Sequence, residues 1–205
     1  MTIKTNLYLA SQSPRRSELL TQIGVSFSVL PVDIDETAKQ NEIPEDYVIR
    51  LAKEKAVTGW NTVKEKANFV LGSDTAVIID GEILGKPESH ADAKRMLNLL
   101  SGKSHQVMSA VALAGLSENH EQPELSCVIS VSEVTFKPLS ANEIEWYVES
   151  GESTDKAGSY AIQGLAASFI THLSGSYSGV MGLPLHETSE LLKKAGISTD
   201  SLVLS

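Results

Sequence analysis

Cysteine and aromatic residues are scarce in this 205-residue chain, which has one cysteine and an aromatic content of 5%. Because Cys127 is the only cysteine, no disulfide can form within the chain, which favours a reducing compartment. Cys127 lies in an alternating apolar stretch, so we expect a buried, inert thiol. No apolar run approaches the roughly 20 residues that a membrane helix needs. Residues 1–7 also lack the apolar core of a secretory signal.

Basic residues are few as well: 17 lysines and arginines stand against 26 acidic residues, a net charge of −9. An anionic chain repels nucleic acid and anionic membrane surfaces at long range, so we expect neither as a partner. A small phosphorylated ligand is compatible with this charge if a local cluster of cations or a metal ion overcomes the overall field. The chemistry therefore depends on where the basic residues concentrate.

Short apolar runs alternate with amphipathic segments along the chain, and 41% of the residues are hydrophobic. The periodicity predicts helices at 14–23, 44–60, 91–100, 141–148 and 186–195, and strands at 7–10, 26–32, 69–79, 107–113, 127–136 and 167–173. Asp80-Gly81 is a strong hairpin signal, so Ile83-Leu84 should return antiparallel, and a polar loop at 117–124 should join two further strands. We predict one α/β domain over residues 1–205, with a mixed β-sheet, flanking helices and two lobes around a central cleft.

The segment Ser11-Gln12-Ser13-Pro14-Arg15-Arg16 lies between the first predicted strand and the first predicted helix. Ser13 suits the N-cap position and Pro14 the first helical position. Two arginines in the first turn oppose the positive end of the helix dipole, unless an anion binds to the free N–H groups, the hydroxyls and the guanidinium groups. An ordinary capped helix with solvent-facing arginines fits the sequence equally well, so both interpretations stay open.

Asp33-Ile34-Asp35-Glu36 places three carboxylates within four residues. They repel one another and raise their own pKa values unless cations intervene. Mg²⁺ or Mn²⁺ would supply the compensating charge, because hard cations prefer oxygen ligands. The alternative is a solvated acidic turn, which is the commoner outcome for such a run. The five histidines show no spacing typical of metal ligands, so zinc is not expected.

Asp74 stands inside a strand-like run, Gly72-Ser73-Asp74-Thr75, with apolar residues on both sides. A carboxylate at such a position is costly unless it is paired or functional. We interpret Asp74 as a general base or metal ligand, with an Asx-type turn as the alternative. The predicted hairpin should bring Lys86, in Gly85-Lys86-Pro87, toward the level of Asp74. There it could neutralise a phosphate, although a lysine in a loop is by itself most often a surface residue.

Several segments together resemble the Maf family of nucleotide pyrophosphatases in order and spacing. The matching segments are Ser11-Gln12-Ser13-Pro14-Arg15-Arg16, Asp35-Glu36-Thr37, Leu51-Ala52-Lys53-Glu54-Lys55-Ala56, Gly72-Ser73-Asp74-Thr75, Gly85-Lys86-Pro87, Ser101-Gly102, Asp155-Lys156-Ala157-Gly158-Ser159-Tyr160, Gln163-Gly164 and Gly182-Leu183-Pro184-Leu185. The resemblance covers nearly the whole chain. It implies an α/β fold related to that of the inosine triphosphate pyrophosphatases, a cytoplasmic homodimer and a divalent metal cation, Mg²⁺ or Mn²⁺, as cofactor.

The resemblance also implies roles for individual residues. Asp74 would be the proton acceptor, with Glu36 and Lys86 assisting, and Glu36 and Asp74 would hold the metal. The substrate-binding set would be Ser11, Ser13, Arg15, Arg16, Lys55, Thr75 and Gln163. Within this set the serines and cations would serve the triphosphate, whereas Arg15, Thr75 and Gln163 would tune base selection.

The segment from Lys156 to Gly164 resembles the branch of the family that acts on dTTP and UTP. The branch acting on 7-methyl-GTP usually lacks a glutamine at the place of Gln163. An amide can match the paired donors and acceptors of a pyrimidine edge. We therefore expect hydrolysis of dTTP, UTP or modified pyrimidine triphosphates to the monophosphate and pyrophosphate. The alternatives are a nucleotide-binding regulator of cell division that does not hydrolyse, and a purine enzyme acting on ITP or XTP.

Overall fold

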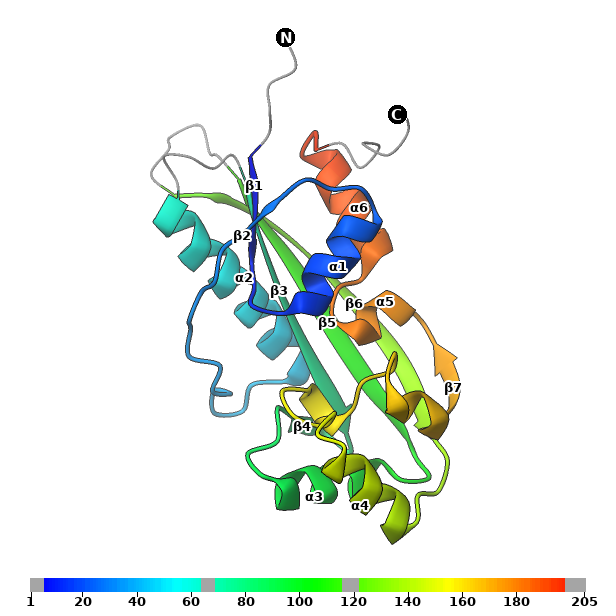
Figure 1. Ribbon diagram of the computed structural model, residues 1–205. Helices are drawn as coiled ribbons and strands as arrows, with labels where there is room; N and C mark the ends of the chain where they lie inside the picture. Colours follow the sequence, from blue (N-terminus) through cyan, green and yellow to red (C-terminus); the bar gives the residue numbers. More distant parts are fainter. Residues whose placement is uncertain (1–5, 64–68, 116–121, 198–205) are drawn as a thin grey trace.

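A mixed β-sheet runs through the molecule in the computed structural model, which describes residues 6–63, 69–115 and 122–197 (Figure 1). Its strands are β1 (Leu7–Ala10), β2 (Ser28–Val29), β3 (Phe69–Ile79), β4 (Glu82–Leu84), β5 (Ser104–Gly115), β6 (Glu124–Phe136) and β7 (Ile170–Ser174). Their order is β2-β1-β3-β5-β6-β7, with β4 paired to β3. β1 is parallel to β2 and β3, whereas all the other ladders are antiparallel. The predicted mixed sheet and the predicted hairpin are therefore confirmed.

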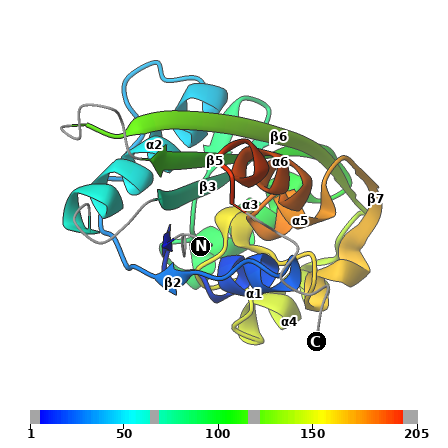
Figure 2. The same ribbon diagram turned by 90° about the horizontal axis from the view of Figure 1, so that it is seen from above.

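Helices cover both faces of this sheet (Figure 2). They are α1 (Pro14–Gln22), α2 (Pro44–Val63), α3 (His90–Leu100), α4 (Ala141–Glu149), α5 (Tyr177–Met181) and α6 (Leu185–Lys194). Successive side chains of a strand point to opposite faces. On β3, Val70 therefore packs in the cluster of α2, and Leu71 packs in the cluster of α1 and α6. Burial on both faces explains why β3 is a nearly continuous apolar run.

A third cluster closes the other end of the sheet, where α3 and α4 pack (Figure 1). Its aromatic members include Phe136, Tyr147, Tyr160 and Phe169. The rings of Phe136 and Tyr160 meet edge to face with centroids 4.9 Å apart, a favourable geometry for aromatic pairs. Since α1 and α6 lie at the opposite end, helices pack at both ends of the one sheet (Figure 1).

The structure corrects two predicted strands. The 26–32 strand is reduced to Ser28–Val29, an exposed edge strand that pairs with β1. Pro31 follows two residues later and has no N–H group to donate to a ladder. The 167–173 strand exists from Ile170 onward as β7, but its first three residues belong to a 3₁₀ helix at Leu165–Phe169. The short helix α5 was not predicted, because its Gly-Ser-rich sequence carries no helical periodicity. Most of the predicted 117–124 loop lies outside the described residues.

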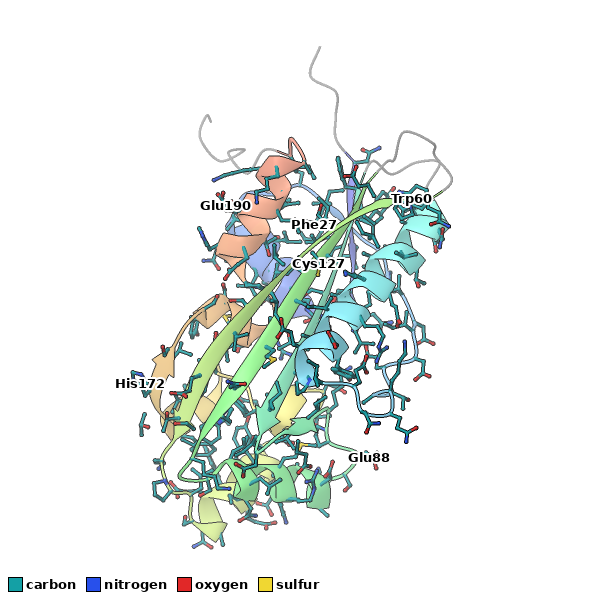
Figure 3. All side chains as sticks on the ribbon, turned by 180° about the vertical axis from the view of Figure 1, so that it is seen from behind. Phe27, Trp60, Glu88, Cys127, His172 and Glu190 are labelled. Atoms are coloured by element: carbon teal, nitrogen blue, oxygen red, sulfur yellow. The ribbon has the colours of Figure 1, made fainter. Side chains whose placement is uncertain are left out.

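Cys127 is half-buried on β6 (Figure 3). Burial raises the pKa of its thiol, which keeps the thiol protonated and fits the expected lack of reactivity. Across the ranges that the structure describes, no helix is both long and apolar enough to cross a membrane.

Candidate functional site

One cavity of about 810 Å³ gathers all ten residues to which the resemblance assigns a catalytic, metal-binding or substrate-binding role, whereas Asp35 of the acidic run is not part of its lining. These residues are Ser11, Ser13, Arg15, Arg16, Glu36, Lys55, Asp74, Thr75, Lys86 and Gln163. They come from the β1–α1 loop, the first turn of α1, the loop before α2, α2, β3, the loop after β4 and the segment before the 3₁₀ helix at Leu165–Phe169. The fold therefore brings together segments that are separated by up to about three quarters of the chain.

The β1–α1 loop is arranged differently from the predicted cap. Ser13 occupies the N-cap position of α1 and Pro14 begins the helix, as predicted, but the Ser13 side chain makes no capping hydrogen bond. Its backbone N–H instead donates to Ser11 Oγ at 3.1 Å. The first turn of α1 also contains no acidic residue. This helix start therefore presents uncompensated positive charge at the cavity wall.

Arg16 is partly buried, and its side chain joins three elements. Its Nε donates to Gly182 O at 2.8 Å, and the two other guanidinium nitrogens donate to Ser11 Oγ at 3.3 Å and Thr75 Oγ1 at 3.4 Å. Burial lowers the pKa of Arg16, and the charges of Asp74 and Glu36 counteract that shift. The arginine side chain faces the protein and not the solvent. The solvent-facing alternative for Arg16 is thus excluded.

Gly72 determines how closely α2 approaches β3. A Cβ on Gly72 would lie 2.3 Å from Ala52 O and 2.6 Å from Ala56 N, so only glycine leaves room for the helix backbone. This approach places Lys55, on α2, beside Asp74, on β3. Lys55 Nζ lies 2.7 Å from Asp74 Oδ1 and 2.7 Å from Glu36 Oε1. One buried ammonium group therefore bridges the two carboxylates that the sequence predicted as metal ligands.

The two bridged carboxylates titrate differently. Burial raises the pKa of Asp74, although the charges of Lys55 and Arg16 and the hydrogen bond from Lys55 act in the opposite direction. Burial also acts to raise the pKa of Glu36, but the hydrogen bond and charge of Lys55, with Lys86 and Arg16, lower it overall. A pair of carboxylates with divergent pKa values in one cavity is a common feature of catalytic sites.

The carboxylate pair fits a divalent cation only in company with a ligand. Within the described part of the chain, no cluster of three or more histidine, cysteine, aspartate or glutamate side chains could hold a metal ion. Mg²⁺ is typically bound through one or two carboxylates, with waters and substrate phosphates completing its coordination. Two carboxylates are the number that this pattern needs, and Lys55 Nζ, 2.7 Å from both, already supplies one positive charge between them.

Further charged groups surround this centre. Arg15, Lys86, Lys156 and Asp155 also line the cavity. Burial lowers the pKa of Arg15 and of Lys156. Cations thus concentrate at one cavity, although the chain as a whole has a net charge of −9. A cavity of this kind suits a polyanionic ligand such as a triphosphate.

Gln163 lies in a loop that is held in place by hydrogen bonds to the Glu152 carboxylate. Glu152 accepts hydrogen bonds from Leu165 N at 2.9 Å and from Tyr147 Oη at 3.0 Å. A Cβ on Gly164 would lie 2.3 Å from Glu152 Oε2, so the glycine after Gln163 makes room for this contact. The loop therefore presents Gln163 at the cavity, where the side chain remains exposed.

Two aromatic residues of the site escaped the sequence reasoning. Tyr47, on α2, is half-buried, lines the cavity and donates a hydrogen bond to Glu36 O at 3.0 Å. Tyr160 lines the cavity and forms a 2.8 Å hydrogen bond with His105 Nε2. Apolar periodicity cannot distinguish a tyrosine that packs from one that also uses its hydroxyl group.

Comparisons with known proteins match nearly the whole chain. A family model described as "Maf-like protein" matches residues 6–195. A dTTP/UTP pyrophosphatase of Shewanella sp. (strain MR-7) is 54% identical over 198 residues, covering 94% of this chain and 99% of the relative. Proteins of the same name from Aliivibrio fischeri and Pseudoalteromonas atlantica are 52% and 50% identical, covering 93% and 94% of this chain and 98% of each relative.

A search of solved structures matches the Staphylococcus aureus Ham1 protein, with a TM-score of 0.43 and 15% identity over 64% of this chain and 72% of that chain. The family match includes every segment that lines the cavity.

Proposed function

The chain belongs to the Maf-like protein family, and we propose that it is a pyrophosphatase that hydrolyses dTTP and UTP to the nucleoside monophosphate and pyrophosphate. The observation that carries this proposal is the Lys55 bridge between Glu36 and Asp74 inside a cavity lined by cations. Relatives about 50% identical over nearly the full chain bear the name dTTP/UTP pyrophosphatase.

In the proposed reaction, water attacks the α-phosphorus, the bond to the bridging oxygen breaks, and pyrophosphate leaves. Asp74 accepts the proton of the attacking water, because a buried carboxylate with a raised pKa is a stronger base than an exposed one. Arg15, Arg16 and Lys86 take up the charge that moves onto the leaving pyrophosphate. A divalent cation bound by Glu36 and Asp74, Mg²⁺ or Mn²⁺, would neutralise phosphate charge at the same place.

Base selection is assigned to the rim of the cavity. Gln163 is exposed there and carries an amide that can pair with a pyrimidine edge. Thr75 Oγ1 already lies 2.7 Å from Ser109 Oγ, so its part in selection is to orient its hydroxyl within that pair. The proposal also includes a cytoplasmic homodimer, which the family resemblance supports.

A panel of nucleotides tests this proposal. With Mg²⁺ or Mn²⁺ present, we expect pyrophosphate release from dTTP and UTP and much slower release from ITP, XTP and the other triphosphates. Selective release from ITP or XTP would favour a purine enzyme. Binding without pyrophosphate release from any nucleotide would favour a regulator that does not hydrolyse. The structure disfavours that regulator, because binding alone does not require a buried base.

The pH profile gives a second test. Asp74 must be ionised to accept a proton, so kcat/KM should rise with pH through an apparent pKa above that of an ordinary aspartate. In the Lys55→Met variant Asp74 loses its nearest cation, which raises its pKa further. We expect the acid limb of kcat/KM to move to higher pH in this variant. A limb that stays in place or moves to lower pH would show that Asp74 is not the titrating base.

A further inference from the structure

The loop that carries Glu36 has no regular structure of its own. Residues 30–43, between β2 and α2, contain neither helix nor strand, and Glu36 is exposed on this stretch. A side chain on an irregular, exposed segment has many accessible positions unless other contacts restrict it. Yet Glu36 Oε1 meets Lys55 Nζ at 2.7 Å. Some other part of the chain must therefore hold the loop in place.

Arg50, on α2, makes contacts that hold the 30–43 loop in place. Its Nε donates to Glu42 Oε1 at 2.5 Å and a terminal nitrogen donates to Glu42 Oε2 at 2.7 Å, a two-point guanidinium–carboxylate pair. The side chains of Arg50 and Glu42 are only 13% and 8% exposed, so solvent weakens the pair less than it would an exposed one. Arg50 also donates to Thr37 O at 3.2 Å. Arg50 therefore binds the loop at both ends of residues 37–42, the segment that follows Glu36.

Two neighbouring contacts complete this arrangement. Glu42 Oε2 accepts a hydrogen bond from Lys39 N at 2.9 Å, and Tyr47 donates to Glu36 O at 3.0 Å. The Arg50 guanidinium lies 5.6 Å from the centroid of the Tyr47 ring, within the range of a cation–π contact. Tyr47, Arg50 and Lys55 all belong to α2, and Gly72 fixes that helix against the strand of Asp74. The helix therefore holds the Glu36 loop and carries Lys55 to Asp74 from one element.

We propose that Arg50 and Glu42 are positioning residues that hold the 36–42 loop so that Glu36 meets Lys55 and Asp74. Neither residue lines the cavity, so neither contacts the substrate there. The inference rests on the proposed pyrophosphatase function, because its purpose is to place Glu36 for that reaction. Loss of the guanidinium fork frees the loop and lowers the fraction of molecules in which Glu36 is correctly placed.

Kinetics of the Arg50→Gln variant test the proposal. We expect kcat for dTTP to fall about ten- to a hundredfold with KM changed less than about threefold, because Arg50 acts through Glu36 and not on the nucleotide. Arg50→Lys keeps the charge but loses the fork, so it should restore only part of kcat. Arg95→Gln is the matched control, because Arg95 also pairs with two carboxylates, Glu82 and Asp92, but lies outside the cavity lining. It should retain wild-type kcat.

A double-mutant cycle and hydrogen exchange separate positioning from other causes. In a Glu36→Gln background, Arg50→Gln should lower kcat by less than about a further twofold, because the Glu36 carboxylate that Arg50 positions is already absent. The amide of Lys39 should exchange faster in Arg50→Gln than in the wild type and not in Arg95→Gln. Equal losses of activity in both backgrounds, or unchanged exchange, would overturn the proposal. If the wild type releases no pyrophosphate from any nucleotide, the proposed function fails, and the exchange result still decides whether Arg50 holds the loop.

Discussion

Replacing Asp74 by Asn is expected to lower pyrophosphate release from dTTP about 10³-fold, within the range that a positioned general base contributes. The amide keeps the shape of the side chain but cannot accept the proton or supply a carboxylate to a cation. The measurement is steady-state release of pyrophosphate with Mg²⁺ or Mn²⁺. Near-normal turnover would remove Asp74 from the role of base.

The same variant should not lose stability. Because burial raises the pKa of Asp74 above its unfolded value, the folded protein loses stability as pH rises through that interval, and the ionised group is unfavourable at neutral pH. An uncharged amide removes this cost, and Lys55 keeps its ion pair with Glu36 at 2.7 Å, so Tm at neutral pH should stay close to that of the wild type. Asp80→Asn is the control, since Asp80 lies on the exposed β3–β4 hairpin and pairs only with the exposed Lys103. It should keep both wild-type activity and wild-type Tm.

Gly72→Ala is expected to lower the free energy of unfolding by about 3 kcal/mol or more, at the upper end of the usual cost of overpacking. The added Cβ would lie 2.3 Å from Ala52 O, and both atoms belong to rigid backbone segments that cannot move aside cheaply. For a chain of this length the loss corresponds to a decrease in Tm of about 10 °C. Turnover should fall as well, at least about tenfold, because α2 carries Lys55 away from Asp74.

Gly85→Ala separates this effect from the general cost of replacing glycine. A Cβ on Gly85 would meet no atom within 4 Å, so its Tm should stay near that of the wild type. Thermal unfolding of both variants, followed by circular dichroism, gives the comparison. Equal Tm values for Gly72→Ala and Gly85→Ala would contradict the close approach of α2 and β3 at Gly72.

Local patterns predicted the elements well where one face of an element is buried by its neighbours. The 69–79 strand and the helix at 44–60 both exist, the helix continuing to Val63. The failures lie in segments with few neighbours or mixed signals. The 26–32 stretch alternates like a strand, but β1 alone pairs with it and most of it stays irregular. Burial by tertiary neighbours, and not propensity, decides such cases.

The residues of the candidate site also differ in whether the sequence could identify them. Asp74 was identifiable because a carboxylate in an apolar strand demands an explanation. Arg50 and Glu42 were not, because charged residues at helix surfaces and in loops are common and their pairing spans an irregular loop. Lys55 entered only through the family resemblance, since nothing in its local sequence distinguishes it from Lys53, the other lysine of α2.

The sequence alone determined the types of chemistry available: carboxylates, a few cations, a single cysteine and no excess of positive charge. Local composition sets these properties, so they can be read without a structure. Only the tertiary structure decided that Lys55 bridges Glu36 and Asp74. That contact depends on backbone approach at Gly72 and on a loop held by Arg50, which are distances between segments that no local pattern contains.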